Sequence, residues 1–224
     1  MTDIHKLVSE NAARWPQMEV HPALVGMFDH IAAALVQPMA KARYQDVAGK
    51  TGVPWYIIAV IHEREASQSW TANLAQGDRW DRPSVHEPHT PAFASWENAA
   101  VYALKSCPPH AANWKDWSPG GALALLEEYN GLGYFQMGRP SPYVWAGTNQ
   151  YVSGKYVSDH HFDAHAIDHQ PGCAPLIARM MKLDGSIDFG RPTSVPVPVQ
   201  SPTVTPVSLP PPPQTLFQKI WSKL

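Results

Sequence analysis

Residues 53–67 read VPWYIIAVIHEREAS, an almost wholly apolar run that ends in two glutamates separated by an arginine. This composition predicts a buried helix. At about 100° per residue, Ile61 and Glu65 share one stripe of that helix, whereas Glu63 lies nearly opposite. We therefore expect Glu65 to point inward and Glu63 to be solvated.

The predicted position of Glu65 has a chemical consequence. Partial burial disfavours the charged form of a carboxyl group and raises its pKa, as a general acid at neutral pH requires. The sequence therefore offers Glu65 as a candidate catalytic acid. The alternative is that Glu65 pairs with an arginine or lysine and serves packing alone.

The rest of the chain is predicted to be mainly α-helical. Apolar residues recur at helical spacing in residues 22–36, 93–106, 121–129 and 172–183, and a further short helix is expected before Gly49 to Gly52. Thr51 can cap the helix that carries Glu65, and Pro54 suits its first turn. Residues 68–94 contain glycine and several prolines and are predicted to form a loop.

Composition divides the chain into three parts. Residues 1–190 are expected to form one domain, because the 224-residue chain is long enough for a single packed core. Nine of the 23 prolines lie between Pro192 and Pro213, so residues 191–213 are expected to be an extended linker. Residues 214–224 form a short, basic, amphipathic tail that is expected either to touch a membrane surface weakly, to bind a partner, or to fray.

Charge and composition exclude some partners and suggest others. The net charge is −2, so no basic field indicates binding to nucleic acid. Nine tryptophans and eight tyrosines suit a groove that stacks on sugar rings, but they also suit a core. Cys107 and Cys173 form no CxxC metal motif and are either one disulfide or two separate thiols. No cofactor is expected.

The amino-terminal residues contain no apolar signal core, and no run in the chain reaches membrane-spanning length. We therefore expect the protein to be made in the cytoplasm without a signal peptide. A substrate outside the membrane would then require another protein, such as a pore, for release.

Two further stretches carry candidate site residues. Asp78 follows Glu65 by thirteen residues and is a candidate second carboxylate, which would orient water or stabilise positive charge on a sugar. The alternative for Asp78 is a turn residue that binds its own backbone. Tyr129 and Asn130 end a predicted helix beside a glycine-rich turn, where a ring and an amide can contact a sugar, unless the turn is a plain helix stop.

The segment from 134 to 156 is rich in aromatic residues and turns, which suits the lining of a groove. Tyr143 and Trp145 are two residues apart and point the same way if the segment is extended. Together with Tyr134, they are candidate substrate-binding residues.

Residues 159–169 offer a different chemistry. If this segment is helical, His161, His165 and His169 share one face and can hold Zn²⁺. The alternative, and our preferred interpretation, is a solvated polar segment without metal.

Several of these motifs together resemble the lysozyme-like superfamily, near goose-type lysozymes, soluble lytic transglycosylases and phage endolysins. The resemblance spans roughly residues 40–183. It rests on residues 61–67 (IHEREAS), 77–78 (GD), 93–97 (FASWE), 126–134 (LEEYNGLGY) and 141–156. Ala66 departs from the serine that usually follows the catalytic glutamate in that superfamily.

The resemblance implies a mainly α-helical lysozyme-like domain with a substrate groove. It implies cleavage of the β-1,4 bond between N-acetylmuramic acid and N-acetylglucosamine in peptidoglycan, with Glu65 as the general acid. It assigns glycan binding to Tyr129 and Asn130, and it places Asp78 at the spacing of a second acid in goose-type enzymes. Whether the enzyme is a hydrolase or a transglycosylase stays open.

These inferences lead to one expected activity and two alternatives. We expect a monomeric glycosidase-type enzyme that acts on the cell wall after release, as an endolysin or a wall-remodelling enzyme does. A non-catalytic glycan-binding or envelope structural protein is the first alternative. A zinc hydrolase built on residues 159–169 is the second.

Overall fold

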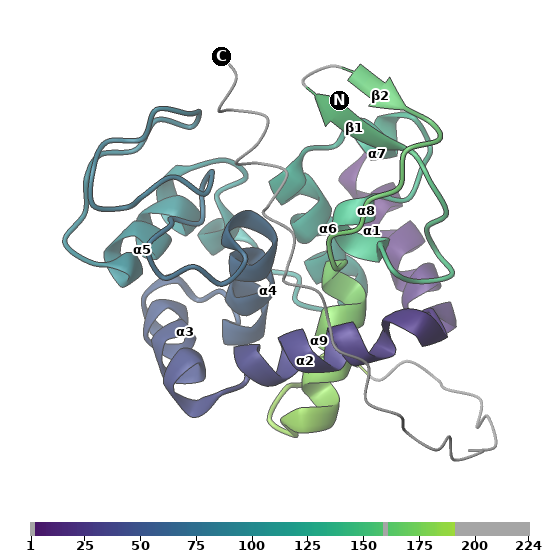
Figure 1. Cartoon of the computed structure of the whole chain (residues 1–224), viewed down its shortest axis with the longest axis horizontal. Helices are drawn as coiled ribbons and strands as arrows, with labels where there is room; N and C mark the ends of the chain where they lie inside the picture. Colours follow the sequence, from purple (N-terminus) through teal and green to yellow (C-terminus); the bar gives the residue numbers. More distant parts are fainter. Residues whose placement is uncertain (1–2, 159–160, 191–224) are drawn as a thin grey trace.

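The computed structural model describes residues 3–158 and 161–190 and is mainly helical, which confirms the expected mainly α class (Figure 1). Its α-helices are α1 (Ile4–Arg14), α2 (Val25–Leu35), α3 (Pro38–Thr51), α4 (Trp55–Ala66), α5 (Trp96–Ser106), α6 (Pro119–Asn130), α7 (Gly133–Gln136), α8 (Pro142–Trp145) and α9 (Cys173–Leu183). Three 3-10 helices are η1 (Trp15–Gln17), η2 (Pro22–Leu24) and η3 (Ala111–Asn113). The expected linker (191–213) and tail (214–224) lie outside the described residues.

A two-stranded hairpin is the sheet structure of the described chain. Strands β1 (Lys155–Ser158) and β2 (His161–Asp163) are antiparallel and pair Lys155 with Asp163 and Tyr156 with Phe162. The register shifts between Tyr156 and Ser158. Residues 161–163 therefore form a strand, not the histidine-bearing helix that was one alternative for this segment.

The core is built around α4. Its side chains from Tyr56 through Arg64 are all buried, and the five from Ile57 to Ile61 have no exposed surface. Helices α3 and α9 both pack against α4, which lies in the middle of the molecule in Figure 1. Each fully buried isoleucine stabilises the fold by about 1.5–3 kcal/mol. The burial of α4 therefore stabilises the packing of the helices around it.

Two expectations about α4 are wrong. Thr51 does not cap it: Thr51 is the last residue of α3, its hydroxyl donates to the carbonyl of Val47, and α4 begins at Trp55. Glu63 is not solvated, because only 9% of its surface is exposed. The helix is surrounded over its whole circumference, so it has no solvent face on which Glu63 could lie.

The chain reverses sharply after α4. Ser67 and Gln68 both have left-handed backbone conformations, with φ of 47° and 61°. The reversal brings the side-chain amide of Gln68 back to Glu63, where it donates a 2.8 Å hydrogen bond to Oε2. Glu65 is thereby left at the point where the buried helix meets the surface.

The segment at Tyr143 is helical, so the condition under which Tyr143 and Trp145 would point the same way is not met. Pro142 starts the short helix α8, in which residues two apart point to different sides. Tyr143 therefore points toward Glu65, whereas Trp145 is fully buried and donates from Nε1 to Asn11 Oδ1 at 3.1 Å. Trp145 is a core residue that links α8 to α1.

Among the described residues, no single helix is long and apolar enough to cross a membrane. The bent pair Pro22–Leu35 and Pro38–Thr51 satisfies both criteria when its two halves are taken together.

The contact between α1 and α6 gives a test of this packing. A Cβ atom on Gly120 would lie 2.5 Å from the carbonyl oxygen of Val8 and 2.8 Å from Cβ of Ala12. We expect Gly120→Ala to lower the free energy of unfolding by about 1–3 kcal/mol, because the two helices must separate. Gly49→Ala is the matched control, since Gly49 is also helical but has nothing within 4 Å of its added Cβ.

The control substitution should raise the free energy of unfolding by about 0.5–1 kcal/mol, because alanine restricts the unfolded chain. Urea denaturation monitored by circular dichroism measures both changes. Equal effects of the two substitutions would contradict the close α1–α6 contact.

Candidate functional site

Glu65 lies at the carboxyl end of α4, half-buried. Burial raises the pKa of Glu65 from 4.5 to about 7, although a hydrogen bond from Tyr143 and the charge of Arg64 act in the opposite direction. The Tyr143 hydroxyl donates to Oε1 of Glu65 at 2.8 Å. At neutral pH the carboxyl group can therefore either donate or accept a proton.

The loop after α4 packs directly against Glu65. Gly77 has a φ of 75°, and a Cβ atom there would lie 2.7 Å from the carbonyl oxygen of Glu65. Asn73 shapes this loop, since its Oδ1 accepts hydrogen bonds from the backbone amides of Ala75 and Gln76 at 2.9 and 3.2 Å. Only glycine fits both the backbone conformation and the space at position 77.

Tyr129 and Asn130 lie at the carboxyl end of α6, as expected. The Tyr129 hydroxyl donates to the carbonyl of Leu74 at 2.9 Å and so connects α6 to the loop beside Glu65. Burial, and next the negative charge of Glu65, raise the pKa of Tyr129 well above its usual range. Asn130 is exposed and precedes Gly131, whose φ is 100°. The structure thus brings the Tyr-Asn pair to the same region as the candidate acid.

Arg64, the neighbour of Glu65, was not among the residues selected from the sequence. Its guanidinium lies 4.6 Å from the centre of the Tyr143 ring, donates to Asp168 Oδ2 at 3.1 Å and donates to the carbonyl of Pro171 at 3.2 Å. Lys155 donates to the other oxygen of Asp168 at 3.0 Å. The signal in the sequence was an arginine inside an apolar helix, which needs a buried counter-ion.

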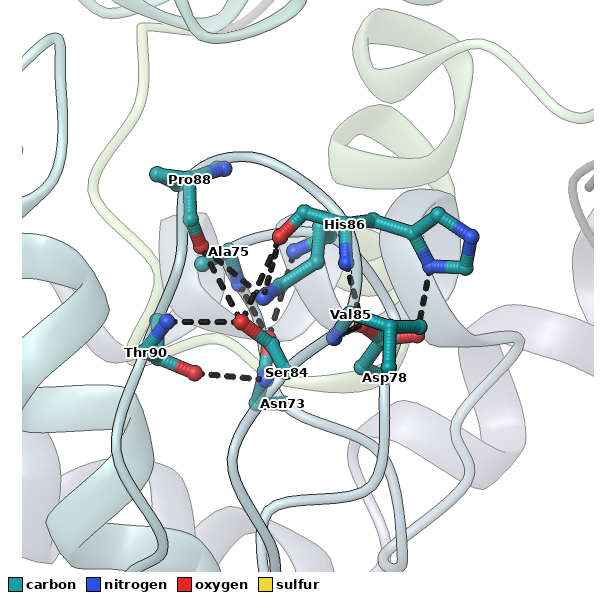
Figure 2. Close-up of polar contacts among 9 residues, drawn as sticks. Asn73, Ala75, Asp78, Ser84, Val85, His86, Pro88 and Thr90 are labelled. Atoms are coloured by element: carbon teal, nitrogen blue, oxygen red, sulfur yellow. Dashed lines mark hydrogen bonds and ion pairs between the residues drawn. The ribbon is translucent and has the colours of Figure 1, made fainter.

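Asp78 has a different environment (Figure 2). Its Oδ2 accepts from the backbone amides of Val85 and His86 at 2.9 and 3.1 Å, and its Oδ1 accepts from Nδ1 of His86 at 2.8 Å. Burial alone would raise the pKa of Asp78, but the hydrogen bonds from His86 and Val85 outweigh it and lower that pKa. Asp78 therefore holds the 78–86 loop together.

Figure 2 also shows a second polar cluster in this loop, away from the imidazole ring of His86. Ser84 and Thr90 bond to each other, with the Thr90 amide donating to Ser84 Oγ at 2.6 Å. Asn73 reaches the Thr90 hydroxyl at 3.5 Å. These contacts join the two ends of the 73–90 loop, so the segment beside Glu65 is a folded unit.

Tyr134 holds the hairpin in place. It is 5% exposed, and its hydroxyl accepts a hydrogen bond from the backbone amide of Tyr156 at 3.0 Å. Its ring also packs edge-on against the rings of Tyr156 and Phe162. In this structure Tyr134 anchors β1 and β2 to α7.

A second carboxyl group has a raised pKa, but it lies away from the surface. Burial raises the pKa of Glu127 on α6 to about 7. Its side chain is 2% exposed and faces Asn11, Arg14 and Glu10 of α1. A group this buried cannot reach a polymeric substrate.

Residues 3–158 and 161–190 contain no cluster of three or more His, Cys, Asp or Glu side chains that could hold a metal ion. His161, His165 and His169 are exposed and lie on a strand and the turns after it, so the helical face proposed for zinc does not exist. Cys107 and Cys173 are both buried and are free thiols, which selects the second of the two expected states.

The fold and this site define a mainly helical protein with a half-buried carboxyl group at the end of its central helix. Comparisons of the chain with protein-family models, with curated proteins and with solved structures yield no match.

The raised pKa of Glu65 gives a prediction about stability. When the pKa of a carboxyl group is higher in the folded state than in the unfolded state, the protein loses stability as the pH rises from the unfolded-state pKa to the folded-state pKa. Glu65→Gln removes this loss. We expect the variant to match the wild type near pH 4 and to be more stable above pH 7, by about 1–3 kcal/mol.

Urea denaturation of both proteins between pH 4 and pH 8 measures this difference. Because Glu63 and Glu127 are present in both proteins, their titration cancels in the comparison. A constant difference across the whole pH range would show that Glu65 titrates normally in the fold.

Proposed function

We propose that the protein cleaves peptidoglycan glycan strands at the β-1,4 bond between N-acetylmuramic acid and N-acetylglucosamine. Glu65 donates a proton to the glycosidic oxygen and so makes the sugar a better leaving group. The observation that carries this proposal is the half-buried carboxyl group with a pKa of about 7, held by Tyr143 at the end of α4. A general acid works best when its pKa lies near the working pH.

The surroundings of Glu65 support a glycan as the substrate. Asn130 is exposed beside Tyr129 and can exchange hydrogen bonds with sugar hydroxyl groups or an acetamido group. Tyr129 closes the region between α6 and the loop that carries Gly77. In this proposal Tyr143 orients the acid and does not stack on a sugar. Trp145 and Tyr134 support the site from the core.

The contacts of Asp78 favour a lytic transglycosylase over a hydrolase. A hydrolase of this kind needs a second carboxylate to direct water. Both oxygens of Asp78 already accept hydrogen bonds: Oδ1 from the His86 ring, and Oδ2 from the backbone amides of Val85 and His86. In the transglycosylase route, Glu65 gives its proton to the glycosidic oxygen and then takes the proton of the muramic 6-hydroxyl group, whose oxygen attacks C1 of the same sugar.

The proposed activity places the protein at the cell wall, in the role of an endolysin or a wall-remodelling enzyme. Its partner is then the glycan strand itself. The main competing function is a non-catalytic module that binds the same strand through Tyr129 and Asn130.

The acid role of Glu65 predicts a large loss of activity on substitution. We expect Glu65→Gln to slow the clearing of a purified peptidoglycan suspension by about 10²- to 10⁴-fold, because the amide cannot donate the proton. Glu63→Gln is the matched control: it lies two residues earlier on the same helix and contacts Gln68, not Tyr143.

The control variant should clear the suspension at a rate close to that of the wild type. Equal rates for all three proteins would refute the acid role. Binding to sedimented peptidoglycan without clearing by any of them would indicate the non-catalytic module.

The assignment to the transglycosylase class predicts a specific product. Mass spectrometry of the released muropeptides should find 1,6-anhydromuramic ends, which are lighter by one water than the hydrolysis product and resist reduction by borohydride. A reaction in water enriched in oxygen-18 provides the control. Incorporation of the heavy isotope at muramic C1 would show that water attacks and that the protein is a hydrolase.

A further inference from the structure

A continuous series of contacts connects the hairpin to the acid. Lys155 on β1 binds Asp168 at 3.0 Å, Asp168 binds Arg64 at 3.1 Å, and the Arg64 guanidinium lies 4.6 Å from the centre of the Tyr143 ring. Tyr143 then donates to Glu65 at 2.8 Å. Arg64, Tyr143 and Asp168 are all less than a tenth exposed, so water screens these interactions little.

Arg64 creates an electrostatic problem for a general acid. A buried guanidinium next to Glu65 favours the ionised carboxylate, which has no proton to give. Its stacking on Tyr143 brings that charge close to the group that holds the acid. A protein that keeps Glu65 protonated must therefore offset the charge of Arg64.

Asp168 supplies the compensating charge. It is 7% exposed and remains ionised, since burial would raise its pKa but the charges of Arg64 and Lys155 outweigh that effect and lower it. Its two oxygens face two different cations, which fixes the carboxylate between them. The hydroxyl of Tyr151 accepts a hydrogen bond from the Asp168 backbone amide at 3.0 Å and holds this residue in position.

We propose that Asp168 is a positioning residue for the candidate acid: by binding Arg64 it holds the guanidinium against Tyr143 and offsets its charge, so that Glu65 keeps its proton. This inference rests on the proposed function, because it concerns the same acid. Asp168 lies 103 residues after Glu65 in the chain and acts through Arg64.

The tyrosine and cysteine side chains that face Glu65 do not change charge near neutral pH. Tyr143 on α8 and Tyr129 on α6 have pKa values well above their usual range because they are buried and lie near Glu65. Burial also raises the pKa of the Cys173 thiol on α9. On α4 itself, burial raises the pKa of Glu63, but Glu63 binds Gln68 and is the same in both variants below, so its titration does not distinguish them. Arg64 and Asp168 therefore supply the fixed charges that can shift the pKa of Glu65.

Two substitutions with opposite expected effects test the inference. Asp168→Asn removes the negative charge beside Arg64 and should lower the titration midpoint of Glu65 by about one pH unit. Lys155→Met removes a positive charge on the other side of Asp168 and should raise that midpoint by a smaller amount. A merely structural role of the network would not shift the midpoint in opposite directions.

The midpoint is measured on the full chain by carbon-13 NMR of labelled glutamate carboxyl groups. The Glu65 signal is assigned as the one lost in Glu65→Gln. Circular dichroism and thermal melting establish that each variant is folded. If Asp168→Asn does not fold, Lys155→Met still decides the question, because an unchanged or lowered midpoint in that variant overturns the inference.

A second measurement separates this inference from the proposed function. On peptidoglycan, the alkaline limb of the pH–rate profile should move with the midpoint, to lower pH in Asp168→Asn and to higher pH in Lys155→Met. Opposite NMR shifts without any cleavage would support the electrostatic role of Asp168 and contradict the proposed activity. Cleavage with an unmoved Glu65 midpoint would overturn the inference alone.

Discussion

The burial of α4 over its whole circumference is the constraint on which the rest of the structure depends. A helix with no exposed side chain from Ile57 to Ile61 must be enclosed by other elements, and α3 and α9 pack directly against it. Its last turn carries three charged residues toward the surface, and two of them, Glu63 and Arg64, are still buried. Glu65 lies at that boundary, so the same packing that stabilises the fold also sets the protonation of the acid.

The buried charge at the end of α4 is stabilised by its contacts. Arg64 is buried, and an isolated buried guanidinium would be strongly unfavourable. Its ion pair with Asp168 and its contact with the Tyr143 ring offset that cost. The contacts also connect the hairpin to the acid through Arg64. A purely apolar replacement would be less costly to bury, but it would leave Tyr143 without its neighbour and Glu65 without its tuning charge.

Much of the fold follows from patterns within single helices. The predictions that were wrong concern how those helices pack and which distant residues they contact. Helical spacing located α4, but it assumes one solvent face, which α4 lacks. Glu63, expected to be solvated, is therefore buried, and Glu65 is half-buried. Trp145 was chosen as a groove residue, but Pro142 starts a short helix in which Trp145 is fully buried. Asp168 was missed because its partner Arg64 lies 104 residues away, and no local pattern records such a pair.

The position of Asp78 shows why spacing along a chain does not determine a catalytic partner. Thirteen residues bring the chain back toward Glu65, as the approach of Gly77 to its carbonyl oxygen shows, but the loop geometry turns Asp78 toward His86. A site with one free carboxyl group must then use it twice, first as acid and then as base. Both steps are possible for a group whose pKa lies near the working pH, because neither of its protonation states is costly to reach. The pKa of about 7 that burial gives Glu65 meets this requirement. A glutamate with its usual pKa is ionised at neutral pH and could act only as the base.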